Sequence, residues 1–356
     1  MTIRTAIIGA SFARDAYLPA LANIDDAEVV AIASARLTSA RATAEQFGIP
    51  QAYDDWQVML KRHDVDLVCI ATPPVLHAPM TLAALEKGAH VLCEKPTAMN
   101  AGEARAMLDA AEAAGLLHII GHELRFNPNR QRIKALLDAG EIGSVRHVNM
   151  TSINAGWGDP ASRPAGDWWS MADMGGGRLG AAGSHAIDLM RWWLGDVAAL
   201  SGQVATMVSD RVDPDTGENW RATADDQYSV LLEMQNGALV SVFMSGAARH
   251  SGGSSLQIFG SEGTIKLGDS DERLLVAHAG EDFEDLSVDD PNAELPHVNS
   301  GIWNVSFVAL MQELCAAIRE GRPLRAGATF ADGLQCQLAL DALKRSSEER
   351  RWVQLD

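Results

Sequence analysis

Short apolar runs alternate with amphipathic segments through the first third of the chain. The apolar runs predict strands at residues 4–9, 29–33, 67–71, 88–92 and 116–121. The segments between them predict helices at residues 16–21, 38–47, 77–87 and 101–114, the last two stopped by glycine. Because run 67–71 is apolar at every position, it is typical of a strand covered on both faces. This alternation predicts a doubly wound parallel sheet with a domain boundary near residue 124.

The rest of the chain has a different pattern, in which strand-like runs follow one another with few helices between them. The runs predict strands at residues 145–153, 200–208, 227–234, 238–245, 254–259 and 263–267. Residues 235–237 (Gln-Asn-Gly) predict a hairpin turn, and helices are predicted at 129–139, 184–193, 303–320 and 331–347. The acidic segment 280–301 reads as an irregular surface loop. We therefore predict an α/β domain at residues 1–124 and an α+β domain with an open, mostly antiparallel sheet at residues 125–356.

Composition narrows the possible partners. The 356-residue chain has a formal net charge of −18, which argues against binding the phosphate backbone of nucleic acid. No apolar run approaches the length of a membrane helix, and the N-terminus enters a strand without a secretory signal pattern. The four cysteines show neither metal-ligand nor disulfide spacing. We expect a soluble, cytoplasmic protein without nucleic-acid, membrane or metal partners.

Residues 94–96 (Glu-Lys-Pro) are the most informative motif, because they follow the buried run 88–92 directly. An ammonium group is costly to bury unpaired, and an X-Pro bond restricts the chain and can be cis. In open α/β sheets, ligands bind in the crevice beyond the carboxyl ends of the strands. Lys95 is therefore our leading candidate for a residue that contacts substrate.

Two segments bear on a nucleotide. After the first strand, residues 9–14 keep only the first glycine, Gly9, of the usual dinucleotide fingerprint, with Ser11, Phe12 and Ala13 behind it. These residues predict a phosphate-binding turn, although an ordinary β–α turn is equally compatible with them. The second strand ends in Ser34 and Arg36 without the acid typical of NAD sites. A serine and an arginine suit a 2′-phosphate, so the pattern favours NADP over NAD. The alternative is that Arg36 is simply a solvated surface charge.

Residues 71–77 (Ala-Thr-Pro-Pro-Val-Leu-His) and 84–96, ending in Cys-Glu-Lys-Pro, resemble the Gfo/Idh/MocA oxidoreductases. That family includes glucose–fructose oxidoreductase and inositol dehydrogenase. Further similar motifs run from Arg125-Phe126-Asn127-Pro128 through Gly175-Gly176-Gly177 to His185, so the resemblance spans nearly the whole chain. It implies an NAD(P)-binding Rossmann domain and a C-terminal domain for substrate binding and oligomerisation. It also implies homodimers or homotetramers formed through the C-terminal sheet, and leaves open that the last helices pack back on the first domain.

The resemblance assigns roles to particular residues. Lys95 lies beside the nicotinamide and the reacting hydroxyl, and His185 is the acid/base. Thr72, Pro73, His77 and Glu94 line the cofactor. The chain departs from the family at Ala181, where inositol dehydrogenase has an aspartate four residues before the histidine. Asp188 shares a helix face with His185 but does not replace that acid.

The substrate side is predicted from aromatic and charged residues around the glycine-rich stretch. Trp157 and Trp168 offer faces to the C–H groups of a sugar, and Arg163 can bind hydroxyls. The alternative is that these rings simply cover the sheet. With Lys95, His185, Asp188 and Arg125, they complete the predicted substrate-binding set.

The combined prediction is an NAD(P)-dependent oxidoreductase that moves a hydride between nicotinamide and a hydroxyl carbon of a sugar, cyclitol or related polyol. Two alternatives stay open. One is a family member that uses bound nucleotide for non-net-redox sugar chemistry, such as glycoside cleavage or epimerisation. The other is a non-catalytic, nucleotide-sensing regulator, which the missing aspartate and the incomplete glycine fingerprint favour.

Overall fold

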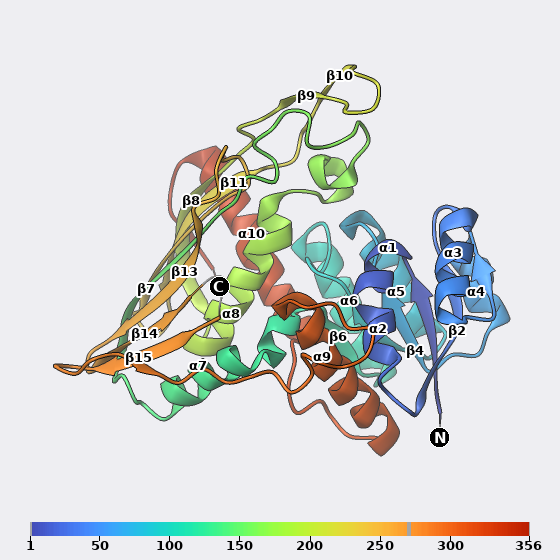
Figure 1. Cartoon of the computed structure of the whole chain (residues 1–356), viewed down its shortest axis with the longest axis horizontal. Helices are drawn as coiled ribbons and strands as arrows, with labels where there is room; N and C mark the ends of the chain where they lie inside the picture. The colour runs from blue at the N-terminus through green and yellow to red at the C-terminus, as the bar shows by residue number, and fades with distance from the viewer. Residues whose placement is uncertain (1, 269–271, 356) are drawn as a thin grey trace. The chain divides into compact units, whose positions relative to one another are not determined.

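The computed structural model describes residues 2–268 and 272–355, and the chain divides into two compact units (Figure 1). The N-terminal unit comprises Met1–Asn127 and Asp290–Leu334, and the C-terminal unit comprises Pro128–Asp289 and Gln335–Asp356. The later segment of the N-terminal unit contains α9 (Ile302–Glu320). The unit built on the parallel sheet therefore recruits residues from near the end of the chain.

The N-terminal unit is a six-stranded parallel sheet in the order β3-β2-β1-β4-β5-β6. Its strands are β1 (Ile3–Ile8), β2 (Ala27–Ala33), β3 (Ala52–Tyr53), β4 (Leu67–Ile70), β5 (His90–Cys93) and β6 (His118–Ile120). Its helices are α1 (Ser11–Asp15), α2 (Tyr17–Leu21), α3 (Leu37–Phe47), α4 (Trp56–Arg62), α5 (His77–Glu86) and α6 (Ala101–Ala114), with short 3₁₀ turns η1 (Pro74–Leu76) and η2 (Glu123–Phe126). The chain builds outward from β1 to one side and then from β4 to the other. The loops after β1 and β4 consequently flank the topological switch point of the sheet.

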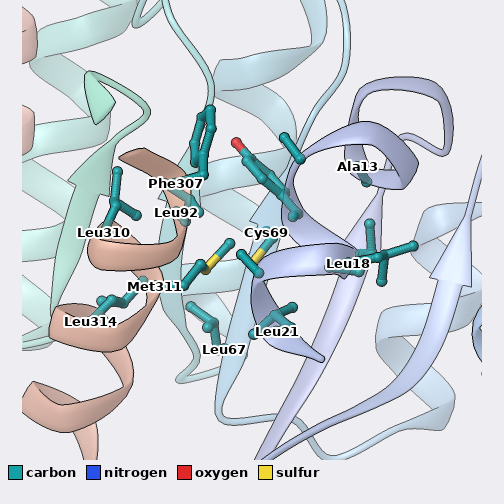
Figure 2. Packing of buried hydrophobic residues seen from close by; sticks show 14 of the residues in the cluster. Ala13, Leu18, Leu21, Leu67, Cys69, Leu92, Phe307, Leu310, Met311 and Leu314 are labelled. Atoms are coloured by element: carbon teal, nitrogen blue, oxygen red, sulfur yellow. The ribbon is translucent and has the colours of Figure 1, made fainter. Parts of the chain in front are cut away.

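Helix α9 closes one face of this sheet. Phe307, Leu310, Met311 and Leu314 on α9 pack against side chains from α1, α2, β4 and β5, and all four are fully buried (Figure 2). Burying four such side chains contributes on the order of 1.5–3 kcal/mol each. The helix is therefore an integral part of the N-terminal core.

The C-terminal unit is a nine-stranded sheet in the order β16-β15-β14-β13-β7-β12-β11-β8-β17. Its strands are β7 (Val145–Ile153), β8 (Val197–Ala205), β11 (Gln227–Met234), β12 (Leu239–Ser245), β13 (Gly253–Gly260), β14 (Gly263–Leu267), β15 (Leu274–His278), β16 (Glu284–Asp285) and β17 (Val353–Gln354). Apart from the parallel pair β7–β12, all its neighbours are antiparallel. The predicted hairpin turn joins β11 to β12, with Gly237 at φ +87°. The predicted fold class is confirmed for both units.

Three helices belong wholly or mostly to the C-terminal unit: α7 (Pro128–Asp138), α8 (Ser184–Leu194) and α10 (Phe330–Glu349). A separate two-stranded sheet pairs β9 (Asp210–Val212) with β10 (Asn219–Arg221). Further single turns are η3 (Trp168–Ser170), η4 (Ala172–Met174) and the π-helical η5 (Leu179–Gly183). No helix in the described part of the chain is long and apolar enough to cross a membrane. All four cysteines are buried and free.

Candidate active site

The predicted cofactor-binding residues gather at the carboxyl edge of the parallel sheet. Gly9 follows β1, and Thr72 and Pro73 follow β4, on the two sides of the switch point. Gly9 has φ +105°, and a Cβ there would lie closer than 3.0 Å to the backbone of Ala71. Only glycine lets these two loops approach so closely. The first amides of α1, which include those of Ser11 and Ala13, have no intrahelical acceptor and are available to an anion.

Glu94 and Lys95 follow β5 at the same edge. Glu94 is buried, and its Oε1 accepts a hydrogen bond from the hydroxyl of Tyr17 at 2.7 Å. Its Oε2 accepts from the Lys95 amide at 3.1 Å. Burial raises the pKa of Glu94 and that of Tyr17. Gly121 leaves room for this carboxylate, since a Cβ there would lie 2.7 Å from Oε1. The Lys95–Pro96 bond is cis.

His77 joins two of these loops. The fully buried ring places Nδ1 2.9 Å from the Pro96 carbonyl oxygen and Nε2 2.9 Å from the Thr72 carbonyl oxygen. Burial lowers the pKa of His77, and a neutral imidazole donates from only one nitrogen. The residue predicted to line the cofactor therefore holds the loops after β4 and β5 in place.

Arg36 and Ser34 lie at the end of β2, whereas Phe12 lies in α1, after the central strand β1. Arg36 is exposed and precedes the first turn of α3, while Ser34 is half-buried and follows β2. The Phe12 ring is 37% exposed and meets the rings of Tyr17 and Phe307 edge-on at centroid distances of 5.7 Å and 5.6 Å. One face of α1 thus offers a partly exposed aromatic ring.

These features fit a nicotinamide dinucleotide. The tight Gly9 turn and the free helix amides suit a pyrophosphate, the end of β2 suits the adenosine ribose, and the residues after β4 and β5 are left for the nicotinamide side. Among the described residues, no group of three or more His, Cys, Asp or Glu side chains is arranged to hold a metal.

Arg125 lies in the same unit with its guanidinium committed to the protein. Nη2 forms an ion pair with Asp332 at 3.1 Å, and Nη1 donates to the Gly327 carbonyl at 3.3 Å. The side chain is 6% exposed. These contacts fasten the first turn of α10 and the segment before it to η2, so any part that Arg125 plays toward substrate stays a prediction.

In the C-terminal unit, His185 and Asp188 are both buried on α8, three residues apart. The preceding turn, η5, is π-helical and contains Ala181 at the position of the absent family aspartate. π-Helical turns often mark functional sites. The structure therefore brings His185 and Asp188 onto one helix face and leaves the relay position apolar.

The predicted substrate residues Trp157, Arg163 and Trp168 all lie in the segment before η5, and the first two are in contact. The Arg163 guanidinium carbon is 5.1 Å from the Trp157 ring centroid, and Nη1 pairs with Asp167 at 3.2 Å. Trp168 stacks on Trp169 with ring centroids 4.2 Å apart. Trp157 is buried, whereas Trp168 is partly exposed.

Sequence reasoning missed four polar residues beside this segment. Asp225 accepts the Leu179 amide at 2.7 Å, and burial raises its pKa to about 6. Burial lowers the pKa of Arg178, and it raises the pKa of the fully buried Tyr228. Arg211 on β9 is 1% exposed. Of these four residues, only Arg178 could have been noticed in the sequence, because it directly follows the three glycines at 175–177.

Comparison with known families decides the class of protein. The model described as "Oxidoreductase family, NAD-binding Rossmann fold" matches residues 3–122, and that of the "GFO/IDH/MocA C-terminal domain" matches residues 130–266. The chain belongs to the Gfo/Idh/MocA oxidoreductase family. The family and the enzyme class predicted from the sequence, an NAD(P)-dependent dehydrogenase or reductase, are confirmed.

Several members of the Gfo/Idh/MocA family are similar along nearly their whole length. Levoglucosan dehydrogenase of Pseudarthrobacter phenanthrenivorans is 28% identical over 349 residues, covering 90% of this chain and 88% of the relative. D-apiose dehydrogenase of Paraburkholderia graminis is 28% identical over 359 residues, covering 98% and 89%. The structure of levoglucosan dehydrogenase in complex with NADH and L-sorbose matches with a TM-score of 0.89 at 26% identity, covering 100% of both chains.

Proposed function

We propose that this family member transfers a hydride between the nicotinamide and a hydroxyl carbon of a sugar, cyclitol or related polyol, oxidising the alcohol to a carbonyl or reducing that carbonyl to the alcohol. The observation that carries the proposal is the sheet edge at which Glu94 and Lys95 follow β5 beside the switch-point loops. Relatives named for sugars, among them levoglucosan and D-apiose dehydrogenases, support the same substrate class.

The nicotinamide, when bound, supplies the hydride chemistry. Lys95 orients the substrate hydroxyl and stabilises negative charge that develops on its oxygen. His185 takes the hydroxyl proton during oxidation and returns it during reduction. Glu94 fixes the backbone at Lys95 through the amide hydrogen bond at 3.1 Å.

The test is a screen of purified protein with NAD and NADP against aldoses, cyclitols and sugar acids, followed at the absorbance of the reduced nicotinamide. Lys95→Ala and His185→Ala should each lower kcat by about 10²- to 10⁴-fold. Matched controls are Lys61→Ala and His278→Ala, which remove exposed side chains of the same kinds. Full activity in Lys95→Ala or His185→Ala would remove that residue from the mechanism. No turnover together with co-purifying nucleotide would favour the non-net-redox or regulatory alternatives.

We also propose a preference for NADP, supported by Arg36 and Ser34 at the end of β2. Arg36→Ala should raise KM for NADP about 10-fold and leave KM for NAD nearly unchanged, because a charge-assisted hydrogen bond to the 2′-phosphate is lost. Equal effects on the two cofactors would contradict the preference.

We further propose a homodimer or homotetramer assembled through the outer face of the nine-stranded sheet. Leu231 on β11 and Leu239 on β12 are 51% and 55% exposed there. Their neighbours Tyr228, Val230 and Leu232 alternate inward and are buried. Exposed leucines on an otherwise regular sheet face are the apolar surface that a second copy would cover.

A further inference from the structure

Three arginines converge in the C-terminal unit from separate parts of the chain. Arg163 comes from the segment after β7, Arg178 from the glycine-rich turn before η5, and Arg211 from β9. A backbone hydrogen bond from the Val212 amide to the Pro160 carbonyl, at 3.1 Å, joins β9 to the segment that contains Arg163. Burial lowers the pKa of both Arg178 and Arg211, and the positive charge of Arg163 lowers both further. Arg163 therefore lies close enough to Arg178 and to Arg211 to repel each of them.

Three carboxylates lie near the three guanidinium groups, and each of them also accepts other donors. Asp225, whose charge raises the pKa of Arg178, accepts the Leu179 amide at 2.7 Å. Asp167 pairs with Arg163 at 3.2 Å and also accepts the Ser170 hydroxyl. Both oxygens of Asp226 accept backbone amides, at 2.7 Å and 2.8 Å, and the carboxylate is 4.0 Å from Nη2 of Arg211. Since these acceptors are already shared with other donors, the acids are weak partners for the cluster.

Several donors of the cluster are buried and lack an acceptor. Nε of Arg178, and Nε and Nη1 of Arg211, have no hydrogen-bond partner within residues 2–268 and 272–355. A guanidinium has five donors and retains its charge, so leaving donors buried and unpaired is costly. The Arg211 side chain is 1% exposed, so it adds positive potential without being open to solvent. Arg163 and Arg178 are only partly buried, so these two can reach a ligand.

The cluster is next to the helix that carries His185. A Cβ on Gly246 would lie 3.4 Å from Arg178 Cδ and 3.5 Å from Trp157 Cγ, so these side chains meet over one glycine. A Cβ on Gly183, the residue before α8, would lie 3.3 Å from the Tyr228 hydroxyl. That hydroxyl is buried and has no partner among the described residues. The hydroxyl of Tyr228 therefore lies against Gly183, which is two residues before the proposed acid/base, His185, in the sequence.

We propose that the substrate carries an oxyanion group, a carboxylate or a phosphate, which Arg163 and Arg178 bind while His185 faces the reacting hydroxyl. The inference rests on the proposed function and names its substrate class: sugar acids or sugar phosphates in preference to neutral sugars. Guanidinium groups recognise both oxyanions through paired hydrogen bonds. A chain with net charge −18 repels anions at long range, so their binding requires a local positive site of this kind.

The kinetic test compares D-glucose with D-gluconate, D-glucuronate and glucose 6-phosphate under the same cofactor. At least one anionic compound should exceed glucose in kcat/KM by more than 10-fold. Comparison of the two sugar acids with the sugar phosphate shows whether the site prefers a carboxylate or a phosphate. Arg178→Gln should lower kcat/KM for that anion about 10- to 100-fold and leave the value for neutral sugar nearly unchanged. Arg221→Gln, at an exposed position on β10, is the matched control and should change neither.

Equal kcat/KM values for neutral and anionic compounds, or equal losses on both in Arg178→Gln, would overturn the inference and leave the dehydrogenase proposal intact. Arg178→Lys, which keeps the charge, should retain part of the preference if Arg178→Gln fails to fold. Calorimetric titration of the wild-type protein with each compound separates the two proposals: selective binding of an anion without turnover supports this inference and contradicts the proposed hydride transfer on this substrate class. Absence of anion binding overturns the inference.

Discussion

Asp225→Asn is the substitution whose effect the structure specifies most fully. Asp225 Oδ2 accepts the Leu179 amide at 2.7 Å, and its other oxygen faces Gly177, where a Cβ would lie closer than 3.0 Å to it. Burial raises the pKa of this carboxyl to about 6 from the ordinary 3.8, although the Leu179 amide lowers it. Asparagine keeps an acceptor for that amide and removes the titration.

The sign of the effect follows from linkage between protonation and folding. Because the pKa of Asp225 is higher in the folded than in the unfolded state, its contribution to stability is complete below about pH 4 and is lost as the pH rises through 6. A difference of about two pKa units corresponds to about 3 kcal/mol. The free energy of unfolding of Asp225→Asn, minus that of the wild type, should therefore increase by about 2–3 kcal/mol between pH 4 and pH 7.

Urea unfolding followed by tryptophan fluorescence at half-unit pH steps measures this difference. Asp215→Asn is the control, because Asp215 is an exposed carboxylate in the neighbouring β9–β10 connection. Its difference from the wild type should stay constant across the range. A constant difference for Asp225→Asn as well would refute the reasoning that burial controls this carboxyl.

Three further substitutions test other parts of the fold. Tyr17→Phe removes the hydrogen bond to the buried Glu94 and should cost about 1.5–3 kcal/mol in chemical unfolding and raise KM for the dinucleotide; unchanged values would show that the bond positions nothing. Gly9→Ala should lower stability by about 3 kcal/mol or more because strain and a backbone clash add, whereas Gly48→Ala, with φ +68° and open space, should cost about 1 kcal/mol; equal melting temperatures would contradict this. Leu239→Glu should reduce the mass measured by light scattering to that of a smaller species, and an unaltered mass would contradict assembly through this sheet face.

The parallel sheet and its ligand-bearing edge were predictable because both depend on local patterns. Apolar runs locate β1, β2, β4 and β5, and the residues directly after a strand must lie at its carboxyl end. Strand β7 and helix α8 were likewise predicted to within one residue at each end. Glu94, Lys95, Thr72 and Arg36 could therefore be assigned to one edge from sequence alone.

Elements with weak patterns were missed. Strand β3 has two residues, and the strands β9 and β10 have three each, too short to show alternation. Helix α4, capped by Asp55, and strand β15 also went unassigned. Helix formation after Gly9 begins at Ser11, earlier than the predicted residue 16, because no side chain caps the start of α1 to mark it. Segment 280–301 contains the two-residue strand β16.

Long-range partners were beyond the reach of sequence patterns. The apolar face of α9 indicates burial but not that its partner is a sheet formed by residues near the other end of the chain. Tyr17 and Glu94 are 77 residues apart, and neither flanking sequence signals the other. Arg178 and Arg211 become neighbours of Arg163 only through loops whose paths depend on the pairing of β9 with β10. Charge clusters of this kind require the tertiary structure.

The carboxylate of Asp225 connects the arginine cluster to the proposed acid/base, His185. Asp225 occupies the space that a side chain at residue 177 would need, and Gly177 adopts φ +116°, which favours glycine. By accepting the Leu179 amide it fixes the first residue of η5, the π-helical turn that leads into α8 and His185. Arg178, which lies between the two residues, is directed by both constraints. Ala181, which stands where the family has an aspartate, therefore lies in a turn whose backbone is held by Asp225. Asp225 positions the turn before His185 although the family's relay residue is missing.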